Sequence, residues 1–539
     1  MNEFTGKTYA EALSTVCERY ADRKALVFEG TTYSFSDVKR EIDRASRRLA
    51  SLGLRRGDKI AIWMPNSADF IFIWMGAAQI GLVAVLMNTR LRLEEAHYQI
   101  QQSDSRAVVV SGATAYRDFL GDVLSMLPDN TADKDAGPGG DKLPMLDFII
   151  TTVRHGNMRS GMHHWHDIAY DENASLDYET DPAAPAQIVY SSGTTALPKG
   201  VMLSHAVWRK AADHGARFYQ TPEDQLYLCI PLFSILSTVN GVMTFWVGGS
   251  SVALAEQFDA VKLLATVQAE KSTAIYLLPV MMSKILELPD FERYDISSLR
   301  TGILLTVDRD VYTTAVEKFG IDGVITSYGM TETSSACTRT WADDPLETRI
   351  TTHGKPLPDI EVRIADADTN EELPQGQIGE IQVRGYNTMI GYYNKPEETS
   401  RAFTVDGWYK TGDAGEMFAD GSFRFISRLV DGYKHKGFNV STAEVETVLL
   451  RHPSVGDAAV TSVPHKDFGE VGVAFVILAE GADFDAATLV AFVKENLAGF
   501  KVPAHVFETD SFPTTSGTGK VQKFKLREQA LQRLKAELD

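Results

Sequence analysis

The chain has 539 residues, of which 44% are apolar and 23% are charged, and 72 acidic residues against 53 basic ones give a formal net charge of −19. This length predicts two to four structural units. The acidic excess argues against a nucleic-acid-binding protein, although a local basic site can still bind a nucleotide inside an acidic protein.

The cysteines and the chain ends carry no targeting or cross-linking pattern. Cys17, Cys229 and Cys337 are scattered, with neither metal-ligand spacing nor the even number of a disulfide framework. This favours a reducing compartment, and we expect a cytoplasmic protein. We find no apolar signal sequence at the first residues and no lipidation or peroxisomal motif at the last ones.

Residues 8–60 predict a helix, a hairpin and a second helix, which runs from Val38 to Leu54 behind the hydroxyl of Ser34. The next segment, Phe70–Met87, is almost wholly apolar and close to the length of a membrane span. Because glycine and glutamine interrupt it, we predict instead a buried helix, a turn at Gly81 and a buried strand, with no membrane span.

Strand-like and helical runs alternate through the first part of the chain. The strand-like runs are residues 59–64, 82–87, 107–111, 148–152 and 188–191. This alternation predicts an α/β architecture of layered sheets and helices with much parallel sheet. From about Pro356, short strands between turn signals predict a small β-barrel-like part of the same domain.

After Arg428 the pattern changes to a helix, two strands and another helix, which predicts a small α+β unit. We therefore predict a large domain over residues 1–428, a hinge over 429–432 and a small mobile domain over 433–539. A histidine group before the central strand (His155, His163, His164 and His166) could suggest a metal site, but a solvated loop explains it better, since no acidic or cysteine partner stands at helical spacing.

The segment Tyr190–Gly200 carries the strongest functional signal. A short apolar strand leads into a loop in which Ser191, Ser192, Thr194 and Thr195 surround Gly193, and Lys199 follows. Glycine lets backbone N–H groups approach a phosphate, the hydroxyls donate hydrogen bonds and the lysine supplies positive charge. The spacing differs from the Walker pattern, so this is a different kind of phosphate-binding loop.

Four further groups of residues could act on a nucleotide. Tyr328 could stack on a purine, and Glu332 could hold Mg²⁺, which prefers one or two carboxylates together with phosphate oxygens. Asp413 follows a tight turn and suits a ribose diol, Arg428 precedes the small domain, and Lys520 follows a glycine-rich loop. Taken singly, each has a commonplace structural explanation, such as core packing, a turn or a solvated surface.

In this order the motifs resemble the adenylate-forming, or AMP-binding, superfamily, and within it the acyl-CoA synthetase (carboxylate–CoA ligase) branch. The resemblance extends from about Tyr9 to Lys520. The motifs that carry it are Tyr190–Gly200, Tyr328–Glu332, Gly379–Gly385, Gly391–Pro396, Gly407–Asp413 and Gly519–Lys520.

The resemblance implies an AMP-forming acid–thiol ligase that uses ATP, Mg²⁺ and CoA in two steps. A carboxylate first attacks the α-phosphate of ATP and releases pyrophosphate, and the thiol of CoA then attacks the acyl-adenylate. Because two anions meet in the first step, cations must neutralise them. By the family's pattern, the small domain then rotates about Asp431, so that Lys520 leaves the site and a different face meets the thiol.

The family's pattern also implies the site residues, and a homodimer is common among its members. Lys520, Thr331 and Glu332 would be catalytic, with Glu332 also the metal ligand. The nucleotide would contact Ser191, Ser192, Gly193, Thr194, Thr195, Lys199, Ser327, Tyr328, Gly329, Asp413 and Arg428. CoA would contact Lys436, Gly437 and Phe438. The acyl pocket would comprise Phe233, Ser234, Ser237, Gly302, Ile303, Leu304 and Met330.

Three segments depart from that pattern. Ala196 stands where the family usually has glycine, which puts the loop geometry in doubt. Ser234 and Ser237 stand where many acyl-CoA synthetases have histidine and glycine, so a role given to that histidine does not carry over. Ile303 and Leu304 add bulk without polarity, which favours an apolar acid that is short, medium-chain or compact and cyclic or aromatic.

Three alternatives stay open. An amino-acid adenylation domain would need a carboxylate near Ile235 to pair with the substrate amine. An acyl-AMP ligase that loads a carrier protein, or a luciferase-like adenylating enzyme, would share the first step and differ in the acceptor. A non-catalytic nucleotide-binding protein on the same fold would bind ATP without releasing pyrophosphate, which the presence of Lys520, Glu332 and Asp413 argues against.

Overall fold

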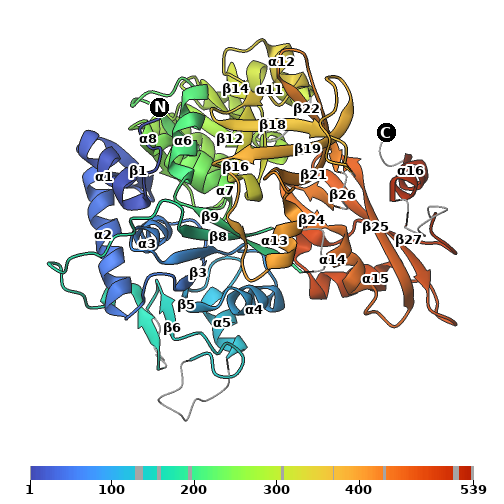
Figure 1. Cartoon of the computed structure of the whole chain (residues 1–539), viewed down its shortest axis with the longest axis horizontal. Coiled ribbons are helices and arrows are strands. Elements are labelled where there is room, and N and C mark those ends of the chain that lie inside the picture. The colour runs from blue at the N-terminus through green and yellow to red at the C-terminus, as the bar shows by residue number, and fades with distance from the viewer. Residues whose placement is uncertain are drawn as a thin grey trace.

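The structure is a computed structural model that describes residues 2–127, 138–154, 160–191, 197–304, 309–367, 369–428, 432–513, 521 and 523–535. At positions 427, 428, 439 and 524 it describes the backbone alone. The chain after residue 432 lies at the right of Figure 1, and the amino-terminal helices lie at the opposite side of the large part.

The amino-terminal segment folds as predicted, into a helix, a hairpin and a helix. These elements are α1 (Tyr9–Arg19), β1 (Lys24–Phe28), β2 (Thr31–Ser34) and α2 (Phe35–Ser51). The hydroxyl of Ser34 accepts a hydrogen bond from the backbone N–H of Asp37, and the Asp37 carboxylate accepts from the backbone N–H of Ser34. This capping box starts α2 directly after Ser34, three residues before the predicted start.

An eight-stranded sheet has the order β20-β9-β8-β4-β3-β5-β6-β7. Its strands are β3 (Lys59–Trp63), β4 (Val83–Leu86), β5 (Ser105–Val110), β6 (Phe148–Thr151), β7 (Met162–His164), β8 (Pro185–Ser191), β9 (Lys199–Ser204) and β20 (Gly391–Tyr392). The apolar segment forms α3 (Ala68–Gln79), a turn at Gly81 with φ +77°, and β4, as predicted. No helix in the described ranges is long and apolar enough to cross a membrane.

A seven-stranded sheet has the order β14-β13-β12-β10-β11-β1-β2 and is parallel except for the β1–β2 hairpin. Its further strands are β10 (Gln225–Leu228), β11 (Ser251–Leu254), β12 (Ala274–Leu277), β13 (Thr301–Leu304) and β14 (Gly323–Ile325). One apolar core joins this sheet, the eight-stranded sheet and the helices around them.

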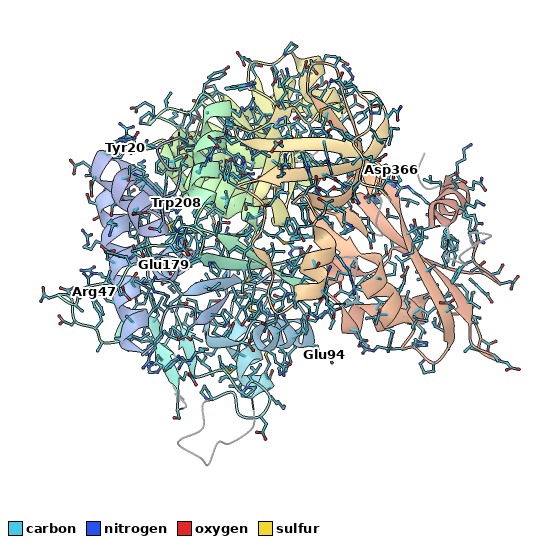
Figure 2. All side chains as sticks on the ribbon, in the orientation of Figure 1. Tyr20, Arg47, Glu94, Glu179, Trp208 and Asp366 are labelled. Atoms are coloured by element: carbon cyan, nitrogen blue, oxygen red, sulfur yellow. The ribbon has the colours of Figure 1, made fainter. Side chains whose placement is uncertain are left out.

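Short and medium helices cover these sheets. They are α4 (Leu93–Gln102), α5 (Phe119–Met126), η1 (Trp165–Asp167), α6 (Val207–Arg217), α7 (Ile235–Ser237), η2 (Thr238–Met243), α8 (Thr244–Val247), α9 (Ala260–Glu270), α10 (Pro279–Leu286), η3 (Phe291–Arg293), α11 (Arg309–Phe319), α12 (Leu346–Thr351) and α13 (Pro396–Ala402). Figure 2 labels Trp208 where α6 meets the amino-terminal helices; its ring lies 5.7 Å from that of Tyr9, centroid to centroid.

Two smaller sheets complete the large part. One contains β15 (Ser327–Met330), β16 (Ser335–Arg339) and β17 (Lys355–Pro356), with η4 (Thr331–Thr333) between the first two. The other contains β18 (Ile360–Ala365), β19 (Ile378–Gly385), β21 (Tyr409–Met417) and β22 (Phe423–Arg428). This second sheet is the part predicted as β-barrel-like, and it is antiparallel throughout, with β18 and β22 at its two ends.

The small part has its own sheet of five strands and its own apolar core. Its elements are β23 (Gly432–His435), β24 (Phe438–Ser441), α14 (Thr442–Leu449), β25 (Val455–His465), β26 (Gly469–Leu478), α15 (Ala486–Asn496), η5 (Gly499–Lys501), β27 (His505–Glu508) and α16 (Lys523–Arg533). The prediction of a large α/β part followed by a small α+β part is confirmed.

Candidate active site

The end of the central strand β8 meets the η4 segment at a buried carboxylate. The hydroxyl of Ser191 donates a hydrogen bond of 2.7 Å to Oε1 of Glu332, and the hydroxyl of Tyr392 donates to the same oxygen at 3.2 Å. Glu332 is 6% exposed. The two predicted residues, 141 positions apart in the chain, therefore come together, and Tyr392 is a partner that our sequence interpretation missed.

Lys199 lies beside this carboxylate, on β9. Its Nζ sits 4.8 Å from the centre of the Tyr392 ring, a cation–π contact. Burial lowers the pKa of Lys199, and the charge of Glu332 opposes that shift. A half-buried amine next to one carboxylate can accept a further anion, as a polyphosphate would require.

Tyr328 and Asp413 also meet, through a hydrogen bond of 2.7 Å from the phenol to Oδ2 of the carboxylate. The Tyr328 ring stacks on Phe425 at 6.0 Å and meets Phe423 edge-on at 5.2 Å, so it is largely buried. Burial raises the pKa of the phenol, and the charge of Asp413 adds to the shift. Asp413 pairs across the β21–β22 ladder with Arg428, which brings three predicted nucleotide-binding positions to one place.

The turn of the small part that was predicted to bind CoA lies against the predicted acyl pocket. The ring of Phe438 stacks on that of Phe233 with centroids 6.3 Å apart. Gly437 has φ +82°, and a Cβ there would lie 3.1 Å from Cδ2 of Leu278. Lys436 has its Nζ 4.0 Å from the centre of the Phe468 ring. A glycine is required here by its backbone angle and by the nearby leucine.

An ion cluster fixes the same contact between the two parts. Nζ of Lys501, on η5, lies 2.5 Å from Oε1 of Glu95 on α4 and 2.8 Å from Oε1 of Glu444 on α14. All three side chains are at least nine-tenths buried. Burial opposes the charge of Lys501, but the carboxylates of Glu444 and Glu95 outweigh burial and raise its pKa.

The two serines that replace the family's histidine and glycine both bond to backbone. Ser234 accepts from the N–H of Leu236 at 3.3 Å, capping α7, and Ser237 donates to the carbonyl of Ile230 at 3.0 Å. These hydroxyls hold the segment that enters η2, so their observed bonds are structural.

The other predicted acyl-pocket residues lie on strands of two sheets. Ile303 and Leu304 are fully buried on β13, and Met330 is half-buried at the end of β15. A Cβ on Gly302 would lie 2.0 Å from the carbonyl oxygen of Ile275, and one on Gly329 would lie 2.1 Å from that of Ser335. The neighbouring strands fill the space at both glycines, which gives each a structural reason to be glycine.

Several predicted residues lie outside the described part of the structure. They are Ser192, Gly193, Thr194, Thr195, Ala196, Asp431 and Lys520, together with the side chain of Arg428. Of the remaining predicted site residues, Ser327, predicted to contact the nucleotide, and Thr331, predicted to be catalytic, are half-buried and flank Tyr328 and Glu332.

Sequence reasoning missed a group of buried cations behind η4. Lys210, His214 and Arg339 are each 0% exposed. Nζ of Lys210 donates to the carbonyl of Thr333, next to Glu332, and Nε2 of His214 lies 3.3 Å from the carbonyl of Ala336. The spacing of Lys210 and His214, four positions apart on one helix face, could have indicated a shared environment; nothing in the sequence indicated Arg339.

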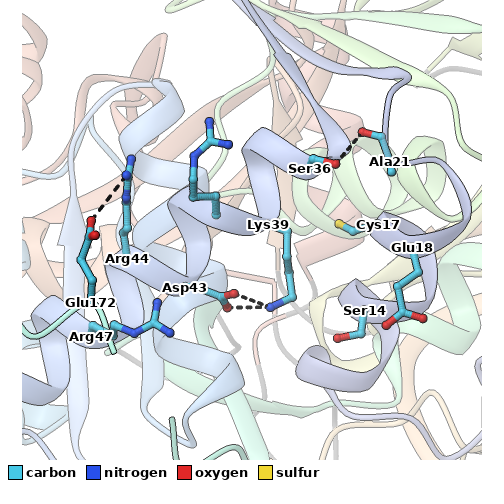
Figure 3. Close-up of a pocket in the computed structure, with 11 residues that line it drawn as sticks. Ser14, Cys17, Glu18, Ala21, Ser36, Lys39, Asp43, Arg44, Arg47 and Glu172 are labelled. Carbon is cyan, nitrogen blue, oxygen red and sulfur yellow. Dashed lines mark hydrogen bonds and ion pairs between the residues drawn. The ribbon is translucent and has the colours of Figure 1, made fainter. Parts of the chain in front are cut away.

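Two other features do not join this site. A groove of about 700 Å³ between α1 and α2, lined by Cys17, Lys39 and Arg47 among others, contains none of the predicted site residues (Figure 3). Of the described histidines in the group before β8, His163 and His164 lie on β7 rather than in a solvated loop. Within the described ranges no three His, Cys, Asp or Glu side chains group as metal ligands.

Comparison with known proteins agrees with this geometry. The model of the AMP-binding enzyme family matches residues 13–393, and that of the AMP-binding enzyme C-terminal domain matches residues 444–520. The chain belongs to the AMP-binding enzyme family. Curated relatives within it are named acyl-CoA synthetases and ligases, which agrees with the branch that the motifs indicated.

Relatives within the family are similar over almost their whole length. The chain is 34% identical to the putative acyl-CoA synthetase YngI of Bacillus subtilis, covering 99% of this chain and 98% of that protein. It is 30% identical to the mitochondrial medium-chain acyl-CoA ligase ACSF2 of Mus musculus, covering 98% and 88%. Among solved structures, the amide bond synthetase McbA of Marinactinospora thermotolerans matches with a TM-score of 0.82 at 28% identity, covering 97% and 99%.

Proposed function

We propose that this AMP-binding enzyme is an ATP-dependent carboxylic acid–CoA ligase that forms an acyl-adenylate and then a thioester. The observation that carries the proposal is the stacking of Phe438 on Phe233, which brings the glycine turn of the small part over the predicted acyl pocket. Because Gly437 has no side chain, a thiol arm would be able to approach the backbone of this turn, where a Cβ would lie 3.1 Å from Cδ2 of Leu278.

In the first step, an oxygen of the acid's carboxylate attacks the α-phosphorus of ATP and pyrophosphate leaves. Lys199 and the hydroxyls that follow β8 would bind the phosphates, while Asp413 would accept hydrogen bonds from the ribose. Lys520 would neutralise the repulsion between the carboxylate and the α-phosphate.

The donor chemistry at Glu332 fits Mg²⁺. Its buried carboxylate offers oxygen ligands, and a magnesium ion typically completes its shell with phosphate oxygens and water. When bound, the ion would neutralise phosphate charge. Ser191 and Tyr392 orient the carboxylate through their hydrogen bonds to Oε1.

In the second step, the sulfur of CoA attacks the acyl carbonyl, the thiol proton is lost and AMP leaves. The small part would rotate about Asp431 between the steps, and the contact of Phe438 with Phe233 suits the second one. An acceptor other than CoA is the main alternative, because the structural relative McbA is named an amide bond synthetase.

We propose an acid whose body is largely apolar, short to medium in length or compact and cyclic, because Ile303, Leu304 and Phe233 are apolar and buried. The medium-chain ligase of mouse among the relatives supports this size range. A homodimer is part of the same proposal, and light scattering coupled to size-exclusion chromatography measures it.

The experiment is a panel of carboxylic acids incubated with ATP and Mg²⁺, with and without CoA. Acid-dependent exchange of labelled pyrophosphate into ATP reports the first step, and loss of free thiol reports the second. We expect both signals with the same acid. Exchange without thiol loss would point to another acceptor, and no exchange with any acid would refute the proposed function.

A further inference from the structure

The buried cations behind η4 share one compartment. Arg339 lies at the end of β16 with its guanidinium carbon 5.2 Å from the centre of the Phe218 ring, and that ring stacks on Tyr276 at 6.4 Å. Lys210 and His214 approach from α6 and contact the carbonyls of Thr333 and Ala336 on either side of the β15–β16 connection. Burial, together with the charges of Arg339 and Lys210, holds the pKa of His214 well below its ordinary value, so its imidazole is neutral. We call the cations Lys210 and Arg339, with His214 beside them, the cation cluster.

The cation cluster lacks a counter-ion from the described chain. Nε and both terminal nitrogens of Arg339 have no hydrogen-bond partner, although the side chain is 0% exposed. Nδ1 of His214 also has none. Among the described residues, no carboxylate forms an ion pair with any member of the cluster. A guanidinium carries five N–H donors that are costly to bury without acceptors, so such a group is retained where something else supplies them.

The side-chain charges reinforce this picture. Burial, together with the neighbouring charge of Arg339, lowers the pKa of Lys210 to about 7. Burial also lowers the pKa of Arg339 to about 10. Two cations that disfavour each other would both be stabilised by one anion between them.

The cluster borders the elements of the predicted acyl pocket. Tyr276, beside Arg339, pairs with Ile303 across the β12–β13 ladder, so both side chains lie on one face of the sheet. The hydroxyl of Tyr276 donates to the carbonyl of Asn240, on η2, which follows Ser237 directly. On the third side, Lys210 bonds to Thr333, two residues after Thr331. The cluster thus lies beside elements that line the predicted acyl pocket.

We propose that Arg339 and Lys210 bind a second carboxylate on the acid substrate, which makes the substrate a dicarboxylic acid. This inference rests on the proposed ligase function. The reacting carboxylate must meet the nucleotide phosphates near Ser191 and Glu332, so an anion in the cation cluster is the far end of the molecule. A carboxylate matches a guanidinium with two parallel hydrogen bonds. The apolar residues between the two ends would hold the chain that connects the carboxylates. A dicarboxylic acid thus replaces the wholly apolar acid expected from the sequence.

The test compares acids of equal length that differ in the far group: butyrate with succinate, hexanoate with adipate, and octanoate with suberate. Pyrophosphate release with CoA gives kcat/KM for each, and the shift in melting temperature with acid alone gives binding without turnover. The variants are Arg339→Met and Lys210→Met, which remove the charge and keep a similar shape. Arg349→Met is the control, since the guanidinium of this buried arginine bonds to the carbonyls of Asp322 and Val324 instead.

We expect kcat/KM for the best dicarboxylate to exceed that for the monocarboxylate of equal length. Arg339→Met should lower kcat/KM for the dicarboxylate by about 10- to 100-fold, which corresponds to the loss of one charged hydrogen bond. The monocarboxylate should keep its rate in Arg339→Met, and Arg349→Met should leave the preference unchanged. If Arg339→Met is unstable, Lys210→Met answers the same question.

The inference would be overturned if the wild type turned over monocarboxylates faster than dicarboxylates and Arg339→Met kept the same preference. Acid-dependent pyrophosphate release in that experiment would still support the ligase function. Stabilisation of the wild type by sulfate as strong as that by the dicarboxylate would also overturn it. If no acid releases pyrophosphate, the ligase proposal fails. In that case, a melting shift with dicarboxylate that Arg339→Met abolishes would still support the anion site, and its absence would refute it.

Discussion

Replacing Glu95 with glutamine is expected to weaken the contact between the small and large parts of the enzyme. Glu95 comes from α4 of the large part, and its Oε1 lies 2.5 Å from Nζ of Lys501 in the small part. Glutamine keeps one side-chain oxygen, which can accept either from Lys501 or from the backbone N–H of Arg92, the donor that Glu95 Oε2 now binds. The change therefore removes the charge and one of the two acceptors. Lys501 keeps its second carboxylate, Glu444.

The size of the effect follows from weakening one of the two ion pairs of Lys501. Hydrogen bonds to charged groups contribute about 1.5–3 kcal/mol, and Lys501 keeps its bond to Glu444, so losing about half of the bond to Glu95 should cost the orientation seen here about 1–1.5 kcal/mol relative to others. This corresponds to a change of about 5- to 12-fold in the equilibrium between orientations. Glu94→Gln is the matched control: Glu94 is the exposed neighbour in the same helical turn, labelled in Figure 2.

Distances between spin labels measure that equilibrium. Cys17, Cys229 and Cys337 are buried, so labels will attach to cysteines introduced at the exposed positions Val261 and Leu450, one in each part. We expect the population at the distance of the present structure to fall in Glu95→Gln and to stay constant in Glu94→Gln. Equal distributions in both variants would show that the Lys501 cluster does not hold this orientation.

Three further outcomes are expected. Lys520→Ala should reduce acyl-adenylate formation by about 100- to 1000-fold and spare thioester formation from supplied acyl-adenylate; equal loss in both half-reactions contradicts this division. Gly437→Val places a branched residue at φ +82° near Leu278, which costs about 1–2 kcal/mol. We expect the thiol step to slow about 10-fold in a stopped-flow assay. Unchanged kinetics would show that this turn does not line the path of the thiol. Burial lowers the pKa of His205 to about 4, so the folded state resists protonation, and stability should fall as pH drops from about 6.5 to 4. Denaturant unfolding of His205→Gln should show that slope reduced by the share of one histidine, because burial lowers the pKa of His353 and His214 in the same direction, and His465→Gln is the control that keeps the full slope.

The sequence alone determined the features that depend on neighbours along the chain. The hydroxyl of Ser34 and the carboxylate of Asp37 form a capping box within one turn, so the start of α2 could be read locally, to within three residues. Gly81 supplies the positive φ of the turn between α3 and β4. This glycine allowed the sequence to distinguish a buried helix and strand from a single membrane-spanning helix. The nucleotide motifs could also be recognised from the sequence, because each is a short run of residues with a defined chemistry.

Only the tertiary structure decided which distant residues share an environment. Lys501 and Glu95 lie 406 positions apart, and their contact depends on how the small part docks against α4. The cation cluster combines residues of α6 with Arg339 at the end of β16, and no local sequence pattern indicates that Arg339 is buried. Burial and strand order arise when separate segments exclude water together, so the cost of burying an unpaired charge arises only once the chain has folded.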